Sequence, residues 1–183
     1  MYINDNALKW YEYALRTGDD SVARFMMNWI AFNFMYGEYR KKDDEGEWNS
    51  ERERISLLCH DKYRDLTIYN PFVEDREATE TLIELPVVKG KRFPEWRGGP
   101  HLPYDRTKKP YEMTPAELWG VTSLGSGLKR VECLLLTLYQ VRCNLFHGSK
   151  DPTFIRDLEL VESAGIVLEG YMKALLHIDS SPR

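Results

Sequence analysis

Three polar residues near the end of one apolar segment, Arg142, Asn144 and His147, have types and spacing that suit chemistry on a phosphodiester. Arginine is a permanent cation, histidine titrates near neutral pH, and asparagine offers a neutral hydrogen-bonding amide. Together these groups can bind a phosphate, move a proton and orient a substrate. The segment 141–150 is therefore the first candidate for a functional site.

A helix has to position these side chains. Apolar residues upstream recur with helical spacing and predict one buried helix face that ends at Gly148; they are Leu134, Leu138, Val141 and Leu145. Arg142, Asn144 and His147 lie off this stripe. On an ideal helix Arg142 and His147 project ~140° apart and are separated by ~7.5 Å along the axis, so one helix alone does not press them together. A long arginine side chain turning at a frayed helix end, or a second copy packed across a two-fold axis, would gather them into one cleft.

An ordinary helix end also favours these residue types. The helix dipole stabilises cations near the C-terminus, and asparagine tolerates helix ends. The composition of the segment by itself therefore leaves a purely structural role open.

The sequence Val-Arg-Cys-Asn-Leu-Phe-His-Gly at 141–148 contains an Arg-x4-His pattern that resembles the signature of the HEPN superfamily, small α-helical domains found in many prokaryotic toxins and defence nucleases. A second segment, 24–36, which contains Trp-Ile-Ala-Phe-Asn, is similar to the first long helix of some members. The two segments stand in the expected order and bracket most of the chain. Members often carry a polar residue, commonly asparagine, directly after the arginine. Here that position is Cys143, and Asn144 is the candidate to take over its role.

The resemblance implies metal-independent endoribonuclease activity in a toxin or defence context, with no metal and no cofactor. His147 would act as general acid or base for attack of the ribose 2′-hydroxyl on the adjacent phosphate, and Arg142 would stabilise the charge that develops on the non-bridging oxygens. Asn144 would orient the substrate or the imidazole. The products would carry a 2′,3′-cyclic phosphate and a 5′-hydroxyl, and DNA would not be cut. Because each chain has one motif histidine, we expect a homodimer with both motifs facing one groove.

Two other interpretations stay open. The first is a non-catalytic HEPN-like module that binds RNA or a protein, for example beside a nucleotidyltransferase antitoxin. The second is a helical scaffold unrelated to the family, in which Arg142 pairs with a carboxylate such as Glu132 or Asp157. A shared basic cleft lined by Arg142 and His147 would favour the nuclease, whereas a dry internal salt bridge would favour the scaffold.

Residues 86–113 differ in kind from the rest of the chain. Six of the nine prolines lie between Pro86 and Pro115, so long regular helices are not expected there. The segment carries a net charge of +4 and leaves −8 for the remainder. Aromatic residues are interleaved with its cations, a combination that grips a single-stranded phosphate backbone and stacks its bases. The predicted RNA-binding residues are Lys89, Lys91, Arg92, Arg97, Lys108, Lys109 and, after the motif, Lys150. The alternative is a surface insertion that its aromatic residues pin to the bundle.

Composition and the absence of known motifs limit which other classes of protein this chain could belong to. With 183 residues the chain is most simply one domain, 1–183, and a formal charge of −4 is unlike a general nucleic-acid coat. Three cysteines without Cys-x2-Cys spacing argue against a disulfide framework and a cysteine-rich zinc site. The sequence has no phosphate-loop, His-Glu-x2-His or Gly-x-Ser-x-Gly motif. It shows neither a basic start followed by an apolar run nor a stretch approaching ~20 apolar residues, so we expect a cytoplasmic protein with no membrane segment.

Helical periodicity predicts an all-α fold, a bundle of about five to seven helices with the basic, proline-rich loop insertion at about 86–113. Beside the motif helix, which begins near Leu128, the expected helices are 6–16, 21–40, 51–69, 73–85, 114–119 and one from about 151 to 175. Ser50 and Glu53 form a capping box, and Asp19, Asp20 or Ser21 can cap the second helix. The last helix is expected to pair with the motif helix as an antiparallel hairpin.

Overall fold

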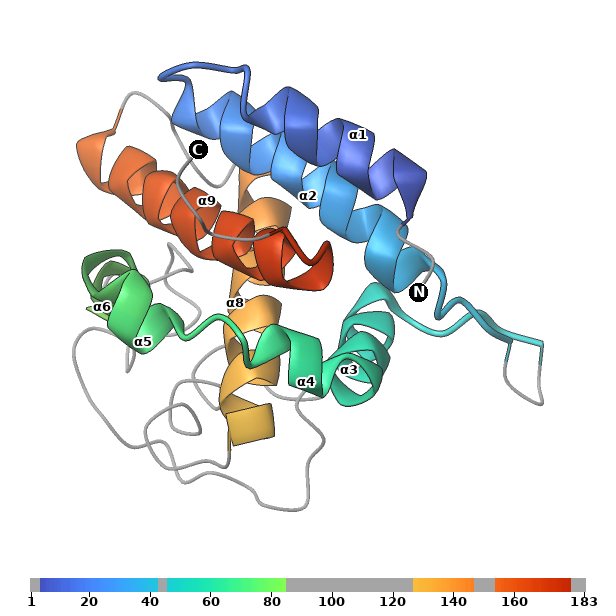
Figure 1. Cartoon of the computed structure of the whole chain (residues 1–183). Helices are drawn as coiled ribbons and strands as arrows, with labels where there is room; N and C mark the ends of the chain where they lie inside the picture. Colours follow the sequence, from blue (N-terminus) through green and yellow to red (C-terminus); the bar gives the residue numbers. More distant parts are fainter. Residues whose placement is uncertain (1–3, 43–45, 85–126, 147–153, 179–183) are drawn as a thin grey trace.

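The computed structural model describes residues 4–42, 46–84, 127–146 and 154–178. Within these residues the predicted all-α bundle is confirmed, and the only strand-like pairing described is an isolated antiparallel bridge between Lys42 and Trp48. The helices are α1 (Asp5–Ala14), α2 (Ser21–Gly37), α3 (Glu51–Asp61), α4 (Tyr63–Leu66), α5 (Pro71–Glu74), α6 (Arg76–Glu84), α8 (Gly127–Phe146) and α9 (Ile155–Leu175) (Figure 1). The basic insertion at 86–113 and the expected helix at 114–119 lie outside the described residues.

A side chain caps the N-terminus of each of the first three long helices. Asn4 Oδ1 accepts a hydrogen bond from the Ala7 amide at 3.0 Å, and Asp20, one of three predicted candidates, accepts one from Ala23 at 2.9 Å. Ser50 Oγ accepts the Glu53 amide at 3.1 Å, which is the first half of the predicted capping box. Each cap satisfies a backbone N–H that has no partner within its helix, so these residues fix where α1, α2 and α3 begin.

The core is built around α2 and α9. The helices α1 and α9 flank α2, and α8 crosses behind α9 (Figure 1). One face of α2 contributes fully buried aromatic rings, and α9 is buried on most sides, so both helices lie at the centre of the fold. The largest buried side chains of these two helices are Phe25, Trp29, Phe32, Tyr36 and Tyr171.

The expected hairpin between the motif helix and the last helix is wrong, because α9 packs most extensively on α2 and α6 and only slightly on α8. Gly165 marks the contact between α9 and α2. A Cβ atom at Gly165 would lie 3.6 Å from Cβ of Phe25, so the two helix backbones approach closely at this point. Chain connectivity places α8 and α9 next to each other in sequence, but the shape of the α2 face decides the packing.

Two expected helices are interrupted. The predicted helix over 51–69 breaks at Lys62, where φ is −100° and ψ is 20°, and continues as α4. The predicted helix over 73–85 begins earlier, with Pro71 at the first position of α5, and restarts as α6 after Asp75. The first break lets α3 pack on α8 while α4 packs on α9, so one continuous helix would not serve both contacts.

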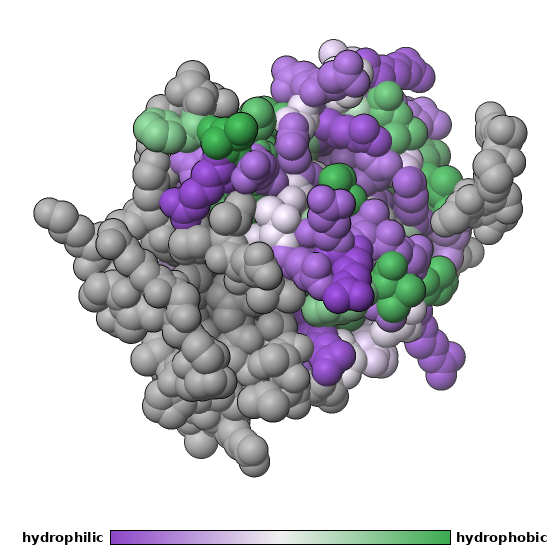
Figure 2. Space-filling view, turned by 90° about the vertical axis from the view of Figure 1, so that its left-hand side faces the viewer, coloured by the Kyte–Doolittle hydropathy of each residue, from purple (hydrophilic) through white to green (hydrophobic). Residues whose placement is uncertain are grey.

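One face of the molecule can be followed in a space-filling view. The face that lies at the left of Figure 1 is mainly hydrophilic, with apolar residues in small separate groups (Figure 2). None of the described helices combines the length and apolar character that a membrane crossing requires.

Candidate functional site

The C-terminal part of α8 is where the helix opens towards solvent. From Val131 to Leu138 every residue is buried, whereas from Tyr139 to Phe146 only Val141 and Asn144 are buried. The buried part fixes the helix in the core, against α3 in particular. The last turns can therefore present side chains from a rigid support.

Arg142 projects from this part of α8 towards the start of α3. Its Nη1 lies 3.4 Å from Glu51 Oε2, and the two side chains retain 24% and 28% of their exposure. The guanidinium carbon also lies 4.8 Å from the centre of the Phe146 ring and 6.0 Å from that of Trp29. The cation is thus held by one carboxylate and two aromatic faces, which is neither a fully dry salt bridge nor an open surface position.

Glu51 is itself held from the other side. Tyr36 Oη donates a hydrogen bond of 2.8 Å to Glu51 Oε1. Tyr36 is fully buried, and its ring packs edge-to-face on Phe32 with centroids 5.3 Å apart. Glu51 also stands at the first position of α3, where the helix dipole favours a negative charge. The carboxylate that meets Arg142 is therefore fixed by the core.

The pKa values of Arg142 and Tyr36 are shifted by these neighbours. Burial lowers the pKa of Arg142, but the contact with the Cys143 thiol and the charge of Glu51 outweigh it, so the net shift is upward. Burial, followed by the charge and hydrogen bond of Glu51, raises the pKa of Tyr36. The pair therefore remains a charged guanidinium beside a neutral phenol that donates to a carboxylate.

Asn144 does not face the same way as Arg142. Side chains two residues apart on a helix point in directions that differ by ~200°. Asn144 is buried, and its Oδ1 accepts a 2.9 Å hydrogen bond from Gln140 Nε2. The prediction that Asn144 lies off the buried stripe is thus wrong, because the buried face of this part of α8 runs through Val141 and Asn144, which point ~60° apart, and leaves Leu145 only partly buried. His147 and Lys150 lie outside the described residues, as do Lys89, Lys91, Arg92, Arg97, Lys108 and Lys109.

The partner of Arg142 differs from the carboxylates that the scaffold interpretation named. Glu132 is 2% exposed and stands ten residues upstream on α8, ~15 Å away along the axis. Asp157 is 1% exposed on α9. Sequence reasoning missed Glu51 and Tyr36, since Glu51 carried only a helix-start signal and Tyr36 stood only at the end of the segment 24–36.

No family model, curated protein or solved structure matches this chain. Its possible activities therefore have to be argued from its own residues.

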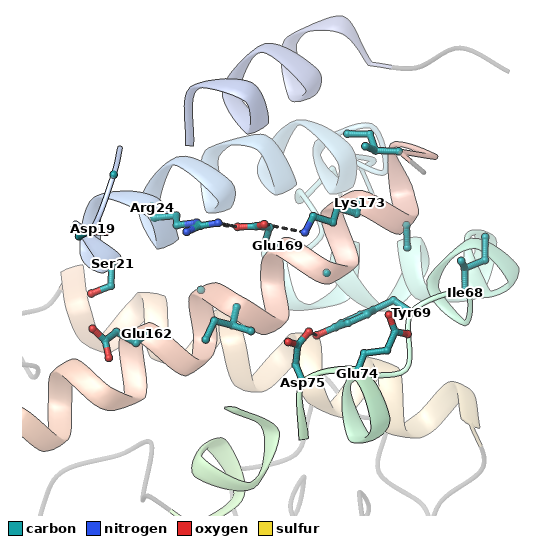
Figure 3. Close-up of a pocket in the computed structure, with 16 residues that line it drawn as sticks. Asp19, Ser21, Arg24, Ile68, Tyr69, Glu74, Asp75, Glu162, Glu169 and Lys173 are labelled. Carbon is teal, nitrogen blue, oxygen red and sulfur yellow. Dashed lines mark hydrogen bonds and ion pairs between the residues drawn. The ribbon is translucent and has the colours of Figure 1, made fainter. Parts of the chain in front are cut away.

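A second feature is a cavity of about 720 Å³ between α2, α9 and the segment that leads into α5 and α6 (Figure 3). Along its back, Glu169 accepts from Arg24 at 2.6 Å and from Lys173 at 3.0 Å, while Tyr69 Oη donates to Asp75 at 2.6 Å. These contacts tie neighbouring elements together. None of Arg142, Glu51 and Tyr36 lines this cavity. The charged side chains Arg24, Glu169 and Lys173 in its wall already form ion pairs with one another.

The described residues contain no cluster of side chains suited to bind a metal ion. Among residues 4–42, 46–84, 127–146 and 154–178, no group of three or more His, Cys, Asp or Glu side chains is arranged to hold a metal ion.

Proposed function

We propose that this chain is a metal-independent endoribonuclease of the HEPN type, with its reactive centre at the C-terminal end of α8. The observation that carries the proposal is the state of Arg142. Glu51 and the Cys143 thiol take contacts from Nη1, Nε is buried without a hydrogen-bond partner, and Nη2 is the donor that forms no hydrogen bond with another described residue. A guanidinium with remaining donors on a rigid helix end suits an anion such as a phosphodiester.

The expected chemistry needs only groups that the chain encodes. His147 takes the proton of the ribose 2′-hydroxyl, whose oxygen attacks the adjacent phosphorus, and the 5′-oxygen leaves with a proton. Arg142 stabilises the negative charge that builds up on the non-bridging oxygens. Each chain has one motif histidine, so a homodimer that faces two motifs towards one groove would provide both the acid and the base. Lys150 and the basic insertion would bind the RNA strand on either side.

The test is cleavage of an end-labelled single-stranded RNA in excess EDTA. The wild type should release fragments with 2′,3′-cyclic phosphate ends and leave the corresponding DNA intact, because DNA lacks the attacking hydroxyl. Arg142→Ala should lower the rate by about 10²–10³, the usual effect of removing a group that stabilises transition-state charge. His147→Ala should abolish cleavage.

Arg130→Ala is a matched control. Arg130 stands on the same helix twelve residues earlier, is exposed, and lies 5.9 Å from the Phe72 ring. Its replacement should leave the rate unchanged. Equal cleavage by the wild type and by both motif variants would show that a contaminating nuclease is responsible.

A second candidate is a non-catalytic module that binds RNA or a protein partner such as a nucleotidyltransferase antitoxin. The ion pair with Glu51 favours it, because a carboxylate near Arg142 offsets part of the positive charge that catalysis would use. The same experiment separates the two candidates. Binding of the RNA without cleavage by any variant would support the module and contradict the nuclease.

A further inference from the structure

The contact between Arg142 and Glu51 is longer than a tight ion pair, so it orients the guanidinium without binding it firmly. Charge-assisted hydrogen bonds of this kind are usually ~2.7–2.9 Å long, and arginine commonly meets a carboxylate through two parallel bonds. Here a single nitrogen, Nη1, lies 3.4 Å from one oxygen of Glu51. The hydrogen bond from Tyr36 to the other oxygen is shorter, at 2.8 Å, so Tyr36 is the firmer anchor of the carboxylate.

The aromatic neighbours restrict the guanidinium in a second direction. Phe146, on the same helix, lies 4.8 Å from the guanidinium carbon, and Trp29 of α2 lies 6.0 Å away. Trp29 is 2% exposed and cannot move without disturbing the core. Glu51, which accepts from the buried Tyr36, and the buried Trp29 ring therefore limit the directions that the guanidinium can take.

We propose that Glu51, braced by Tyr36, is a positioning residue that holds one edge of Arg142 so that the other edge meets a phosphate. The inference rests on the proposed function and adds two residues to its site. Neither Glu51 nor Tyr36 touches the reacting atoms in this scheme. Their effect passes through the orientation of Arg142.

A positioning role and a simple charge effect predict opposite results for Glu51→Gln. The substitution removes one negative charge beside the anion site. If Glu51 is only a neighbouring charge, its loss should strengthen phosphate binding and speed cleavage. If it positions Arg142, the neutral amide of glutamine holds the guanidinium more weakly than the carboxylate does, and kcat should fall even though repulsion of the RNA has been reduced.

The first experiment compares kcat and KM for single-stranded RNA cleavage by the wild type, Glu51→Gln and Glu53→Gln. Glu53 is the matched control, because it lies two residues further along the same helix and the ion pair of Arg142 is formed with Glu51. We expect Glu51→Gln to lower kcat about tenfold with KM unchanged or reduced, and Glu53→Gln to match the wild type. A kcat for Glu51→Gln equal to or above that of the wild type would overturn the proposal.

Tyr36→Phe tests the hydrogen bond from Tyr36 to Glu51 separately. The ring that packs on Phe32 stays, but the hydrogen bond to Glu51 is lost. We expect a smaller fall in kcat than for Glu51→Gln, and no further fall when both substitutions are combined. Additive effects of the two substitutions would show that Tyr36 does not act through Glu51.

A second measurement does not depend on cleavage. The Arg142 Nε–H resonance, assigned by its absence in Arg142→Lys, is followed by NMR while inorganic phosphate is added. The wild type should show a restrained side chain and a saturable shift, and Glu51→Gln should show a mobile side chain with a shift at least about fivefold weaker. If the wild type cuts no RNA, the proposed function fails, but this comparison still decides whether Glu51 positions Arg142 for an anion. Identical mobility and phosphate response in the two proteins would overturn the inference.

Discussion

Replacing Gly170 with alanine should destabilise the protein markedly, although alanine is the better helix former. Gly170 lies within α9, and a Cβ atom there would stand 2.2, 2.4 and 2.5 Å from three carbons of the Tyr69 ring. Tyr69 cannot easily retreat. It is 6% exposed, its hydroxyl donates to Asp75 at 2.6 Å, and its ring packs edge-on against Tyr171 with centroids 5.0 Å apart.

The magnitude follows from two opposing effects. Alanine in place of glycine in a helix interior stabilises by ~1 kcal/mol. Displacing a buried aromatic ring costs about as much as truncating it, ~3–5 kcal/mol. The expected net loss is therefore about 2–4 kcal/mol, a large part of the ~5–15 kcal/mol that stabilises a typical domain.

Denaturant unfolding followed by circular dichroism measures this loss, provided that the dependence on denaturant is the same in both proteins. Gly165→Ala is the matched control on the same helix, since its Cβ would meet Phe25 at an ordinary 3.6 Å and should stabilise by up to ~1 kcal/mol. In a Tyr69→Ala background, Gly170→Ala should cease to destabilise. A loss below ~1 kcal/mol, or equal behaviour of the two glycine variants, would refute the close packing of α9 against Tyr69.

Two further predictions concern α8 and α3. Burial raises the pKa of Glu132 above its usual 4.5, although the charges of His60 and Lys129 oppose the shift. The folded state therefore holds this proton more tightly than the unfolded state, so the stabilisation is present below about pH 4.5 and is lost as the pH rises through the raised pKa. Glu132→Gln should flatten this decline in unfolding free energies measured from about pH 4 to pH 8, and an unchanged slope would contradict it. Ser50→Ala removes the cap of α3 and should lower the unfolding free energy by ~1 kcal/mol, whereas an unchanged value would mean that water satisfies the Glu53 amide equally well.

The fold was predictable where local signals agree with the packing. The motif helix was expected from about Leu128 and begins at Gly127, because a long apolar run between breaking residues leaves little choice. The break at Lys62 was not predictable, since no glycine or proline stands there. It arises because α3 and α4 pack on different helices, which is a property of the assembled bundle.

The candidate site was predictable only in part, for a related reason. Periodicity indicated that Arg142 leaves the buried stripe near a helix end, and the structure bears this out. Its partner Glu51 stands 91 residues away in the sequence, and Tyr36 is a further 15 residues from Glu51. Such separations leave no pattern in a single sequence. The burial of Asn144 was missed for the same reason, because the tertiary packing decides which flank of the apolar stripe is covered.

Arg142, Glu51 and Tyr36 differ in burial, so the effect of a substitution on cleavage can be separated from its effect on the stability of the protein. Tyr36 is fully buried, whereas Glu51 and Arg142 keep 28% and 24% of their side-chain exposure. Partly exposed ion pairs contribute only ~0–1 kcal/mol, so Glu51→Gln and Arg142→Ala should leave the unfolding free energy within about 1 kcal/mol of the wild type. A loss of cleavage without a loss of stability then belongs to the site itself. Substitutions at Leu138 or Val141, which are fully buried on the same helix, would instead lower both together.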